Sequence, residues 1–174
     1  MKKCLTLFAV GILAGCGSDH LGTAWQRIEP PIAAPEFRLP TLQGEVAQLS
    51  DYRGQVVILE FWATWCGPCR SSLPSLEVMS KRYRDRGVTV LLVNQQESAK
   101  DIHRWTKQRY TVSILLDERG EVATSYGVDG IPQLFVINQQ GQMVYRHGGY
   151  GGGLERNLAL ILEELLATPA TTHV

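Results

Sequence analysis

The stretch FWATWCGPC, residues 61–69, places Cys66 and Cys69 three positions apart at the end of an apolar run. That run extends from Val56 to Trp62 and is interrupted only by Glu60, which is typical of a strand buried on both faces. Apolar residues at helical spacing follow the second cysteine. The sequence therefore predicts a buried strand that leads to a cysteine pair at the start of a helix.

Two cysteines at this spacing and place are suited to reversible disulfide chemistry. They are close enough to form a small disulfide ring, in which Gly67 and Pro68 keep the turn tight. Because of the positive end of the helix dipole and the free backbone amides, we expect the pKa of Cys66 to fall from about 8.5 toward 7 or lower. We expect the Cys66 thiolate to attack a partner's disulfide and Cys69 to resolve the mixed disulfide.

A zinc site is the main alternative for a CxxC pair. Zinc requires four ligands, usually from a second CxxC pair or from two closely spaced histidines. The histidines of this chain stand alone and far apart, at His20, His103, His147 and His173. A purely structural disulfide also fits poorly, because so small a ring constrains little of the unfolded chain. We predict no metal and no cofactor other than the redox-active Cys66–Cys69 disulfide.

The composition bounds the class of protein. The chain has 174 residues, enough for one domain with a hydrophobic core, and its 17 basic residues balance its 17 acidic ones. A formal charge of zero gives no indication of nucleic acid as a partner. At the N-terminus, Lys2 and Lys3 precede an apolar run from Cys4 to Ala14 that is too short to span a bilayer. This pattern is typical of a secretory signal.

The end of that segment, Leu13-Ala14-Gly15-Cys16, resembles the lipobox of bacterial lipoproteins. The resemblance implies a signal peptide over residues 1–15, a lipid on Cys16, and a place in the bacterial cell envelope facing the periplasm. An ordinary cleaved signal with an incidental cysteine is the alternative. With Cys4 removed and Cys16 acylated, one free cysteine pair remains.

The chain after the signal divides into a predicted tether and one domain. Residues 16–34 contain Pro30 and Pro31 without apolar periodicity, so we expect a lipid-anchored flexible tether. Residues 35–174 alternate strand and helix patterns, which favours an α/β domain. Strands are predicted at 36–39, 46–49, 56–62, 88–94, 113–116, 133–138 and 142–147, with helices after the cysteine pair and at 98–109, 121–126 and 154–167.

WCGPC with the preceding FWA resembles the thioredoxin superfamily, and the likeness extends beyond this motif. Glu60 stands where thioredoxins carry a buried aspartate, and Pro74 stands at the family's helix kink. Ile131-Pro132 matches the cis-proline position, which implies that the backbone there meets the substrate's cysteine segment. Trp65 is expected to form the exposed apolar surface that receives the partner, whereas Trp62 is expected to pack in the core.

Within this superfamily the chain is most similar to the membrane-anchored TlpA/ResA-type oxidoreductases. FRLPTLQGEVAQLSDYRGQVVILEFWATWC, residues 37–66, resembles their N-terminal extension, and the interval between Cys69 and Pro132 resembles their central insertion. The resemblance implies a thioredoxin fold, in which a central mixed β-sheet is flanked by helices. An N-terminal β-hairpin and a helix-strand insertion are added to it.

Two departures from the family concern proton transfer. Those relatives often carry an acid three residues after the second cysteine, where this chain has Ser72, and the lysine of thioredoxins has no counterpart. Proton transfer therefore falls on Glu60, which we expect to accept the proton of Cys69 with a pKa raised by burial. The alternative is that Glu60 lies exposed at an edge or pairs with a cation.

The resemblance implies a membrane-tethered thiol–disulfide oxidoreductase that reduces exported proteins, because Gly67-Pro68 resembles the reducing thioredoxins. Cytochrome c maturation is the common assignment for such relatives. The expected partners are an exported client with a disulfide, an upstream membrane thiol–disulfide electron donor, and the membrane itself through Cys16. We expect a monomer.

Two other functions are possible on the same fold. A thiol peroxidase of the peroxiredoxin type requires proline and threonine where this chain has Leu59 and Ala63. A Sco-like copper-binding assembly protein uses CxxxC, one residue longer than the spacing here, together with a distant histidine. His147 is the conceivable third ligand for that reading.

Overall fold

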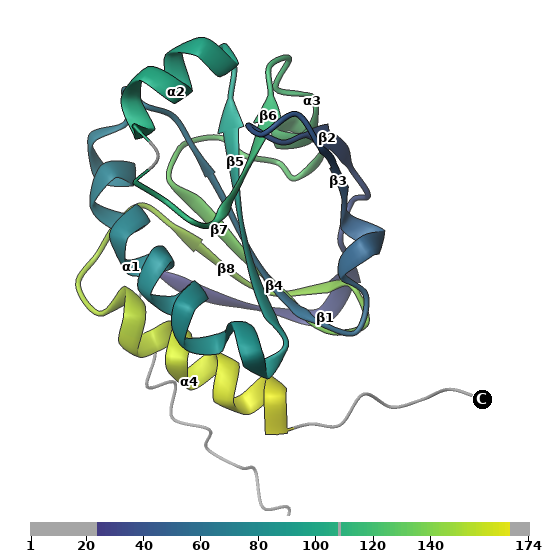
Figure 1. Cartoon of the computed structure of the whole chain (residues 1–174). Helices are drawn as coiled ribbons and strands as arrows, with labels where there is room; N and C mark the ends of the chain where they lie inside the picture. The colour runs from purple at the N-terminus through teal and green to yellow at the C-terminus, as the bar shows by residue number, and fades with distance from the viewer. Residues whose placement is uncertain (1–23, 108, 168–174) are drawn as a thin grey trace, which may run out of the picture.

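The computed structural model describes residues 24–107 and 109–167, which form a six-stranded mixed sheet with helices on it (Figure 1). The strand order across the sheet is β1-β8-β7-β4-β5-β6. Strands β4, β5 and β6 run parallel to one another, whereas β7 is antiparallel to β4, and β8 to β7. The strands are β1 (Trp25–Ala33), β4 (Val56–Trp62), β5 (Val88–Gln95), β6 (Ser113–Asp117), β7 (Gln133–Ile137) and β8 (Gln142–Gly148).

The two faces of the sheet are covered differently. Helices α1 (Gly67–Tyr83), α2 (Ala99–Thr106) and α4 (Leu154–Ala167) cover one face, with α1 and α4 side by side (Figure 1). The other face carries the small hairpin of β2 (Arg38–Pro40) and β3 (Val46–Gln48), the turn Leu49–Tyr52, and α3 (Glu121–Ser125). This is the predicted thioredoxin fold, with its hairpin extension and with α2, β6 and α3 inserted between β5 and β7.

Strand β4 holds the two layers together, because all seven of its residues are buried. Its side chains alternate between the faces, so that Ile58 and Trp62 join the core beneath α1 while Leu59 and Phe61 join the core beneath the hairpin. By the same alternation Glu60 faces α1. Pairing with β5 on one side and β7 on the other leaves β4 no free edge.

The predicted strands and helices of the domain are present, with small differences at their ends. The strand 56–62 and the helix 154–167 have the predicted bounds. The predicted helix 98–109 is shorter, because Ser98 caps its N-terminus and Lys107 takes a left-handed conformation at its C-terminus. In α1 the predicted core positions Leu73, Leu76 and Tyr83 are fully buried.

The predicted tether over residues 16–34 is wrong where the structure describes it, because Trp25–Ala33 forms the edge strand β1. This strand pairs antiparallel with β8, and its first residue, Trp25, is buried against Tyr145 and His147. Pro30 lies where the register shifts between Arg27 and Ile32, so its missing N–H breaks no ladder bond. The first described strand of the domain thus begins at Trp25, before the predicted domain start at residue 35. Residues 1–15 and Cys16 lie outside the described residues.

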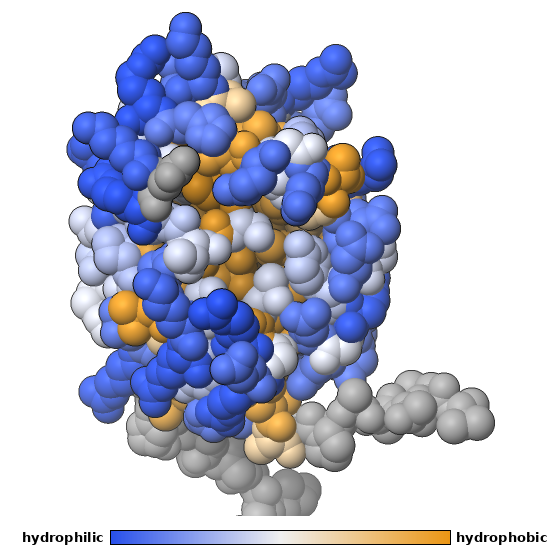
Figure 2. All heavy atoms as spheres, in the orientation of Figure 1, coloured by the Kyte–Doolittle hydropathy of each residue, from blue (hydrophilic) through white to orange (hydrophobic). Residues whose placement is uncertain are grey.

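The surface shows a polar exterior around an apolar centre. On the face seen in Figure 2, hydrophilic residues gather around the rim, while apolar ones show between them. Among residues 24–107 and 109–167, none of the helices combines the length and apolar character needed to cross a bilayer.

Candidate active site

The cysteine pair lies at the N-terminus of α1, where the chain leaves β4. Cys66 is the N-cap residue and is joined to Cys69 by a disulfide, with 5.3 Å between their Cα atoms. The Cys69 amide donates to the Cys66 sulfur at 3.2 Å, so a free amide of the first turn points at that sulfur. Pro68 occupies the first turn, where a missing N–H removes no helical bond. Cys66 retains slight exposure, at 4 %, whereas Cys69 has none.

The two tryptophans of the motif lie in opposite environments, as the sequence predicts. Trp65 is 70 % exposed beside Cys66, and it is the most exposed large apolar side chain among the described residues. Trp62 is completely buried and packs against Trp105 of α2, with 5.4 Å between ring centroids. The structure thus places one aromatic ring in the core cluster that contains both cysteines and another on the surface next to Cys66.

The Ile131–Pro132 peptide is cis, in agreement with the sequence-based expectation. It directly precedes β7, whose Gln133 pairs with Phe61, so Pro132 lies beside the end of β4 from which the cysteine loop departs. The Gly149 amide donates to the Pro132 carbonyl oxygen at 2.8 Å and connects this turn to the loop after β8. Ile131 is half-buried and packs on both cores. These contacts fix the turn close to the cysteine loop.

Glu60 is buried in the middle of the sheet, with 1 % of its surface exposed. Burial raises its pKa to about 8, and a hydrogen bond from Ser72 partly counters that rise. Its position in a central strand rules out an exposed edge, and no ion pair to Glu60 is present among residues 24–107 and 109–167. The carboxyl is therefore largely protonated at neutral pH and is able to exchange a proton near it.

Ser72 connects Glu60 to the cysteine pair, a contact that sequence reasoning missed. Its hydroxyl oxygen lies 2.6 Å from Glu60 Oε1 and 2.9 Å from the carbonyl oxygen of Cys69. In the sequence this position stands out only because it lacks the acid that similar proteins often carry there. The available signal was helical spacing, since residues i and i+3 share a face of a helix and Cys69 faces the core.

Glu97 was also missed, although it holds the loop that carries the motif. Its carboxylate accepts a hydrogen bond from the Thr64 amide at 2.7 Å, another from the Thr64 hydroxyl, and one from Asn94 Nδ2 at 2.8 Å. Thr64 immediately precedes Trp65, so these bonds set the path of the chain into the cysteine pair. No local pattern relates Glu97 to Thr64, because 33 residues separate them.

His147, the histidine considered as a copper ligand, lies on β8 and is 5 % exposed. Its ring packs on Trp25, with 4.7 Å between centroids, and burial lowers its pKa despite the backbone hydrogen bond at Gly149. Within the described part of the chain, no three His, Cys, Asp or Glu side chains gather as a metal site would require.

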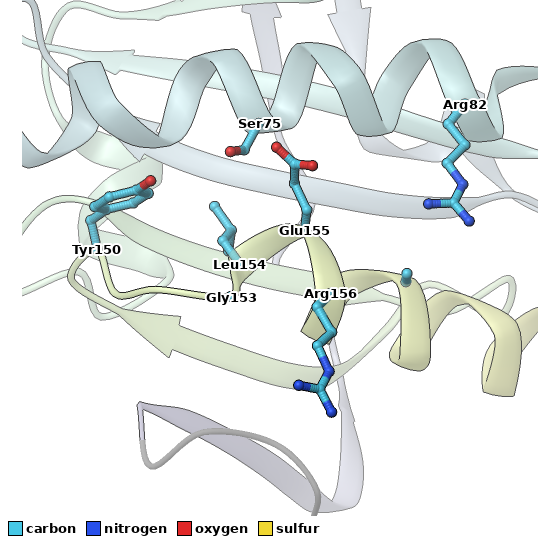
Figure 3. Close-up of a pocket in the computed structure, with 8 residues that line it drawn as sticks. Ser75, Arg82, Tyr150, Gly153, Leu154, Glu155 and Arg156 are labelled. Carbon is cyan, nitrogen blue, oxygen red and sulfur yellow. The ribbon is translucent and has the colours of Figure 1, made fainter.

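A surface hollow of about 500 Å³ lies between α1 and the start of α4 (Figure 3). Neither cysteine lines it. Tyr150 forms one end, in the loop that Gly149 connects to Pro132, and Arg82 lies toward the far end of α1. Glu155 extends toward α1, whereas Arg156 points away from it. The hollow therefore extends away from the disulfide along the two helices.

The mixed sheet, the disulfide that caps α1 and the cis-proline turn beside it define a thioredoxin-like disulfide oxidoreductase. The chain belongs to the AhpC/TSA family, whose model matches residues 32–146. The relatives and solved structures that follow identify it as a TlpA/ResA-like member of the thioredoxin superfamily.

Two curated relatives align over most of both chains. The chain is 31 % identical over 154 residues to the thiol-disulfide oxidoreductase ResA of Bacillus thuringiensis, covering 83 % of this chain and 88 % of the relative. It is 35 % identical over 156 residues to the thioredoxin-like protein YneN of Bacillus subtilis, covering 86 % and 91 %.

Solved structures show the same architecture. A thiol:disulfide interchange protein assigned as DsbE from Chlorobium tepidum aligns with a TM-score of 0.74 and 34 % identity, over 78 % of this chain and 96 % of that one. The exposed lipoprotein thioredoxin Etrx1 of Streptococcus pneumoniae aligns with a TM-score of 0.67 and 32 % identity, over 75 % and 100 %.

Proposed function

We propose that this protein reduces disulfides of exported proteins and that Cys66 is its attacking thiol. The observation that carries the proposal is the asymmetry of the pair. Cys66 keeps slight exposure next to the exposed Trp65, whereas Cys69 is fully buried, and its backbone carbonyl is connected through Ser72 to Glu60. A client's cysteine segment reaches Cys66 across Trp65 and the Ile131–Pro132 turn, and it does not reach Cys69.

The reaction transfers two electrons from the reduced pair to the client. The Cys66 thiolate attacks one sulfur of the client disulfide, forming a Cys66–client bond and releasing the other client sulfur as a thiolate that takes a proton from water. Cys69 then loses its proton and attacks the Cys66 sulfur. The Cys66–Cys69 disulfide forms, and the second client thiolate leaves. An upstream thiol donor must return two electrons before the next turnover.

Glu60 is the proton acceptor in the second step. Cys69 is remote from solvent, so its thiol requires a buried base to become a nucleophile. A carboxyl whose pKa is about 8 is neutral in part and ionised in part near physiological pH, which suits it to take up and return a proton.

Several features support a reducing role at a membrane. Gly67-Pro68 resembles the dipeptide of reducing thioredoxins. The Leu13–Cys16 lipobox supports a lipid on Cys16 and an envelope location, and the related Etrx1 is itself described as an exposed lipoprotein. A lipid-held reductase takes its electrons from a membrane thiol–disulfide donor. Apocytochrome c is one client of suitable chemistry, because its cysteines must be reduced before haem attachment.

The two alternative functions receive less support. Leu59 and Ala63, where a peroxidase motif needs proline and threonine, are both fully buried apolar side chains. His147 is covered by Trp25, as described above, and the CxxC spacing is one residue shorter than the copper-binding motif.

Trapping of the client tests the proposal. A Cys69→Ser variant expressed in cells should accumulate mixed disulfides through Cys66, which non-reducing electrophoresis separates and mass spectrometry identifies. The matched control is the Cys66→Ser, Cys69→Ser double variant, which has no attacking thiol. Equal amounts of trapped protein in the variant and the control would refute Cys66 as the attacking group.

A membrane-retention experiment tests the anchor separately. Replacing Cys16 by Ser should move the protein from the membrane fraction to the wash, because it removes the site of acylation. Unchanged retention would refute the lipid assignment without affecting the dithiol mechanism.

A further inference from the structure

The hydroxyl of Ser72 lies between two groups that both belong to the redox site. Its oxygen is 2.6 Å from Glu60 Oε1 on β4 and 2.9 Å from the carbonyl oxygen of Cys69, one turn earlier in α1. Glu60 and Ser72 are each 1 % exposed and Cys69 is not exposed at all, so bulk water does not compete at this point. This contact is buried and polar, and it joins the carboxyl of Glu60 to the backbone of the resolving cysteine.

A serine hydroxyl carries one proton and has two lone pairs. A carbonyl oxygen accepts hydrogen bonds and never donates them, so Ser72 donates to Cys69 or to Glu60 but not to both at once. If Glu60 is ionised, it too is only an acceptor, and one of the two contacts lacks a proton. If Glu60 is protonated, its O–H donates to Ser72 Oγ and Ser72 donates to Cys69. Both short contacts of Ser72 can therefore be hydrogen bonds at the same time only when Glu60 is protonated.

We propose that Ser72 is a positioning residue of the dithiol site, whose hydroxyl turns from the Cys69 carbonyl oxygen to the Glu60 carboxylate when Glu60 loses its proton. The rotation gives the buried carboxylate a charge-assisted hydrogen bond at the moment when it has no other described donor. Ser72 therefore makes the ionised form of Glu60 accessible inside the core, although it never touches the client. This inference rests on the proposed role of Glu60.

None of the other titratable groups described around Glu60 replaces the Ser72 hydroxyl as its hydrogen-bond partner. On β8, His147 faces the same side of the sheet with Leu134 between them, and burial keeps it neutral by lowering its pKa. On α1, Glu77 is engaged by Thr111 instead. Cys66 and Cys69 titrate only when they are reduced.

On α4, the carboxylates of Glu163 and Glu164 bond to other partners, Arg86 and Tyr145 respectively. Burial is the largest cause of the raised pKa of Glu60, and Ser72 is the side chain that lowers it. Among the described residues, no charged group adds to these two causes.

The test is a titration of Glu60 in the oxidised full-length protein, without client. Carbon-detected NMR of labelled glutamate side chains, or the infrared carbonyl band of the protonated carboxyl, reports the pKa of Glu60 directly. Ser72→Ala should raise that pKa by about one unit, since the carboxylate loses its hydrogen-bond donor. Ser72→Thr keeps a hydroxyl that reaches the i−3 carbonyl in a helix, so it should restore the wild-type value.

The matched control is Ser71→Ala, which removes the same hydroxyl from the preceding, exposed position of α1. It should leave the pKa of Glu60 unchanged. In single-turnover release of a client thiol, the alkaline rise of the rate should shift upward by about one pH unit in Ser72→Ala, about tenfold slower at pH 7. Ser71→Ala and Ser72→Thr should follow the wild-type profile.

An unchanged pKa and pH profile in folded Ser72→Ala would overturn the proposal. If Ser72→Ala does not fold, the titration of wild type and the pH profile of Ser72→Thr still test the proposal. A Glu60 that is already fully ionised at pH 6 in the oxidised wild type, or a displaced profile in Ser72→Thr, overturns it as well. Failure of Glu60 itself is a separate result: release would then be equal in wild type and Glu60→Gln, whatever the titration of Ser72 variants shows.

Discussion

Two buried carboxyls, Glu60 and Glu77, lie near opposite ends of α1, and the pKa of one is raised while that of the other is lowered. Near the N-terminal end, Glu60 of β4 has one described hydrogen-bond partner, Ser72, and burial raises its pKa to about 8. Toward the C-terminal end, burial also acts to raise the pKa of Glu77, but hydrogen bonds outweigh it. They come from the side chain and amide of Thr111, from Lys81 and from the amide of Val112, and the pKa of Glu77 is lowered.

The difference shows that burial alone does not decide the charge of a carboxyl. Glu77 is 8 % exposed and Glu60 is 1 % exposed, so both are largely removed from water. What separates them is the number of donors that the fold directs at each. The well-bonded carboxylate of Glu77 fastens a loop to α1. The poorly bonded carboxyl of Glu60 is left able to take up and release a proton.

The largest expected effect is the loss of disulfide reduction when the site at the N-terminal end of α1 is changed, with no such loss when Glu77 is changed. Cys66→Ser should abolish reduction of insulin or of a model disulfide, because no other described thiol reaches a client. Glu77→Gln should retain this activity in the folded protein. In the reduced wild type, iodoacetamide at neutral pH should modify Cys66 much faster than Cys69. Residual reduction by Cys66→Ser, or equal labelling of the two thiols, would contradict the assignment.

Glu60→Gln should slow release of the mixed disulfide by about a hundredfold at neutral pH, the low end of the range for a lost general base. In the wild type the release rate should rise as pH approaches about 8, where Glu60 ionises, and the variant should lack this rise. Pre-steady-state turnover from pH 6 to pH 9 measures both. Alkylation of Cys66 should be nearly unchanged, and Glu77→Gln serves as the control. Identical release in wild type and Glu60→Gln would make Glu60 a structural residue.

The same substitution should stabilise the protein, and the gain should grow with pH. A carboxyl whose pKa is raised on folding holds its proton in the folded state after the unfolded chain has lost it. Stability is therefore greatest below the unfolded pKa, near 4.5, and is lost as pH rises to about 8. Glu60→Gln removes this loss, so it should exceed wild type by about 4 kcal/mol at pH 8 and by little at pH 4.5. Urea unfolding of the oxidised proteins at both pH values measures the difference.

Glu77→Gln should have the opposite sign, with a loss of about 2 kcal/mol at pH 7. Its folded pKa is lowered, so its contribution is present above the unfolded pKa and is lost as pH falls through the folded one. On acidification, the free energy of unfolding of Glu77→Gln should therefore approach that of wild type from below. That of Glu60→Gln should approach it from above. A difference from wild type of the same sign in both variants at pH 7 would contradict the comparison.

The smallest expected effect concerns Glu97, which resembles Glu77 in having several donors. Glu97→Gln should cost about 1 kcal/mol, because the hydrogen bonds from Thr64 and Asn94 lose their charged acceptor. The pH at which client release accelerates should stay as in wild type, since Glu60 keeps its surroundings. Chemical unfolding measures the loss of stability, and the pH profile of client release tests whether the proton transfer is unchanged. A displaced profile would place Glu97 within the proton chemistry.

The parts of the fold that sequence reasoning predicted are those with dense local signals. The run from Val56 to Trp62 has no polar residue other than Glu60, and the apolar stripe of the last helix repeats at helical spacing, so both elements have the expected bounds. The burial of Glu60 followed from the same run. The cis peptide before Pro132 followed from a family motif and not from the local sequence.

The parts that were missed depend on contacts between distant residues. β1 is an edge strand that needs pairing on one side only, and Pro30 interrupts its pattern without breaking its ladder. Ser72 is an ordinary helical serine until β4 places Glu60 opposite it. Glu97 meets Thr64 only because β5 and β4 end next to each other. In each case the sheet brings the partner into place.

The pairing of β1 has a consequence for how far the redox centre can travel. Trp25 pairs with His147, His147 with Leu134, and Leu134 with Glu60, so the chain enters the fold level with Glu60 and about 15 Å from it, three strand spacings away. If Cys16 is acylated, the nine residues from it to Trp25 reach at most about 30 Å from the bilayer. In that case a membrane-embedded donor within this radius would meet the disulfide at an effective concentration of about millimolar, whereas a client held farther out would have to diffuse to it.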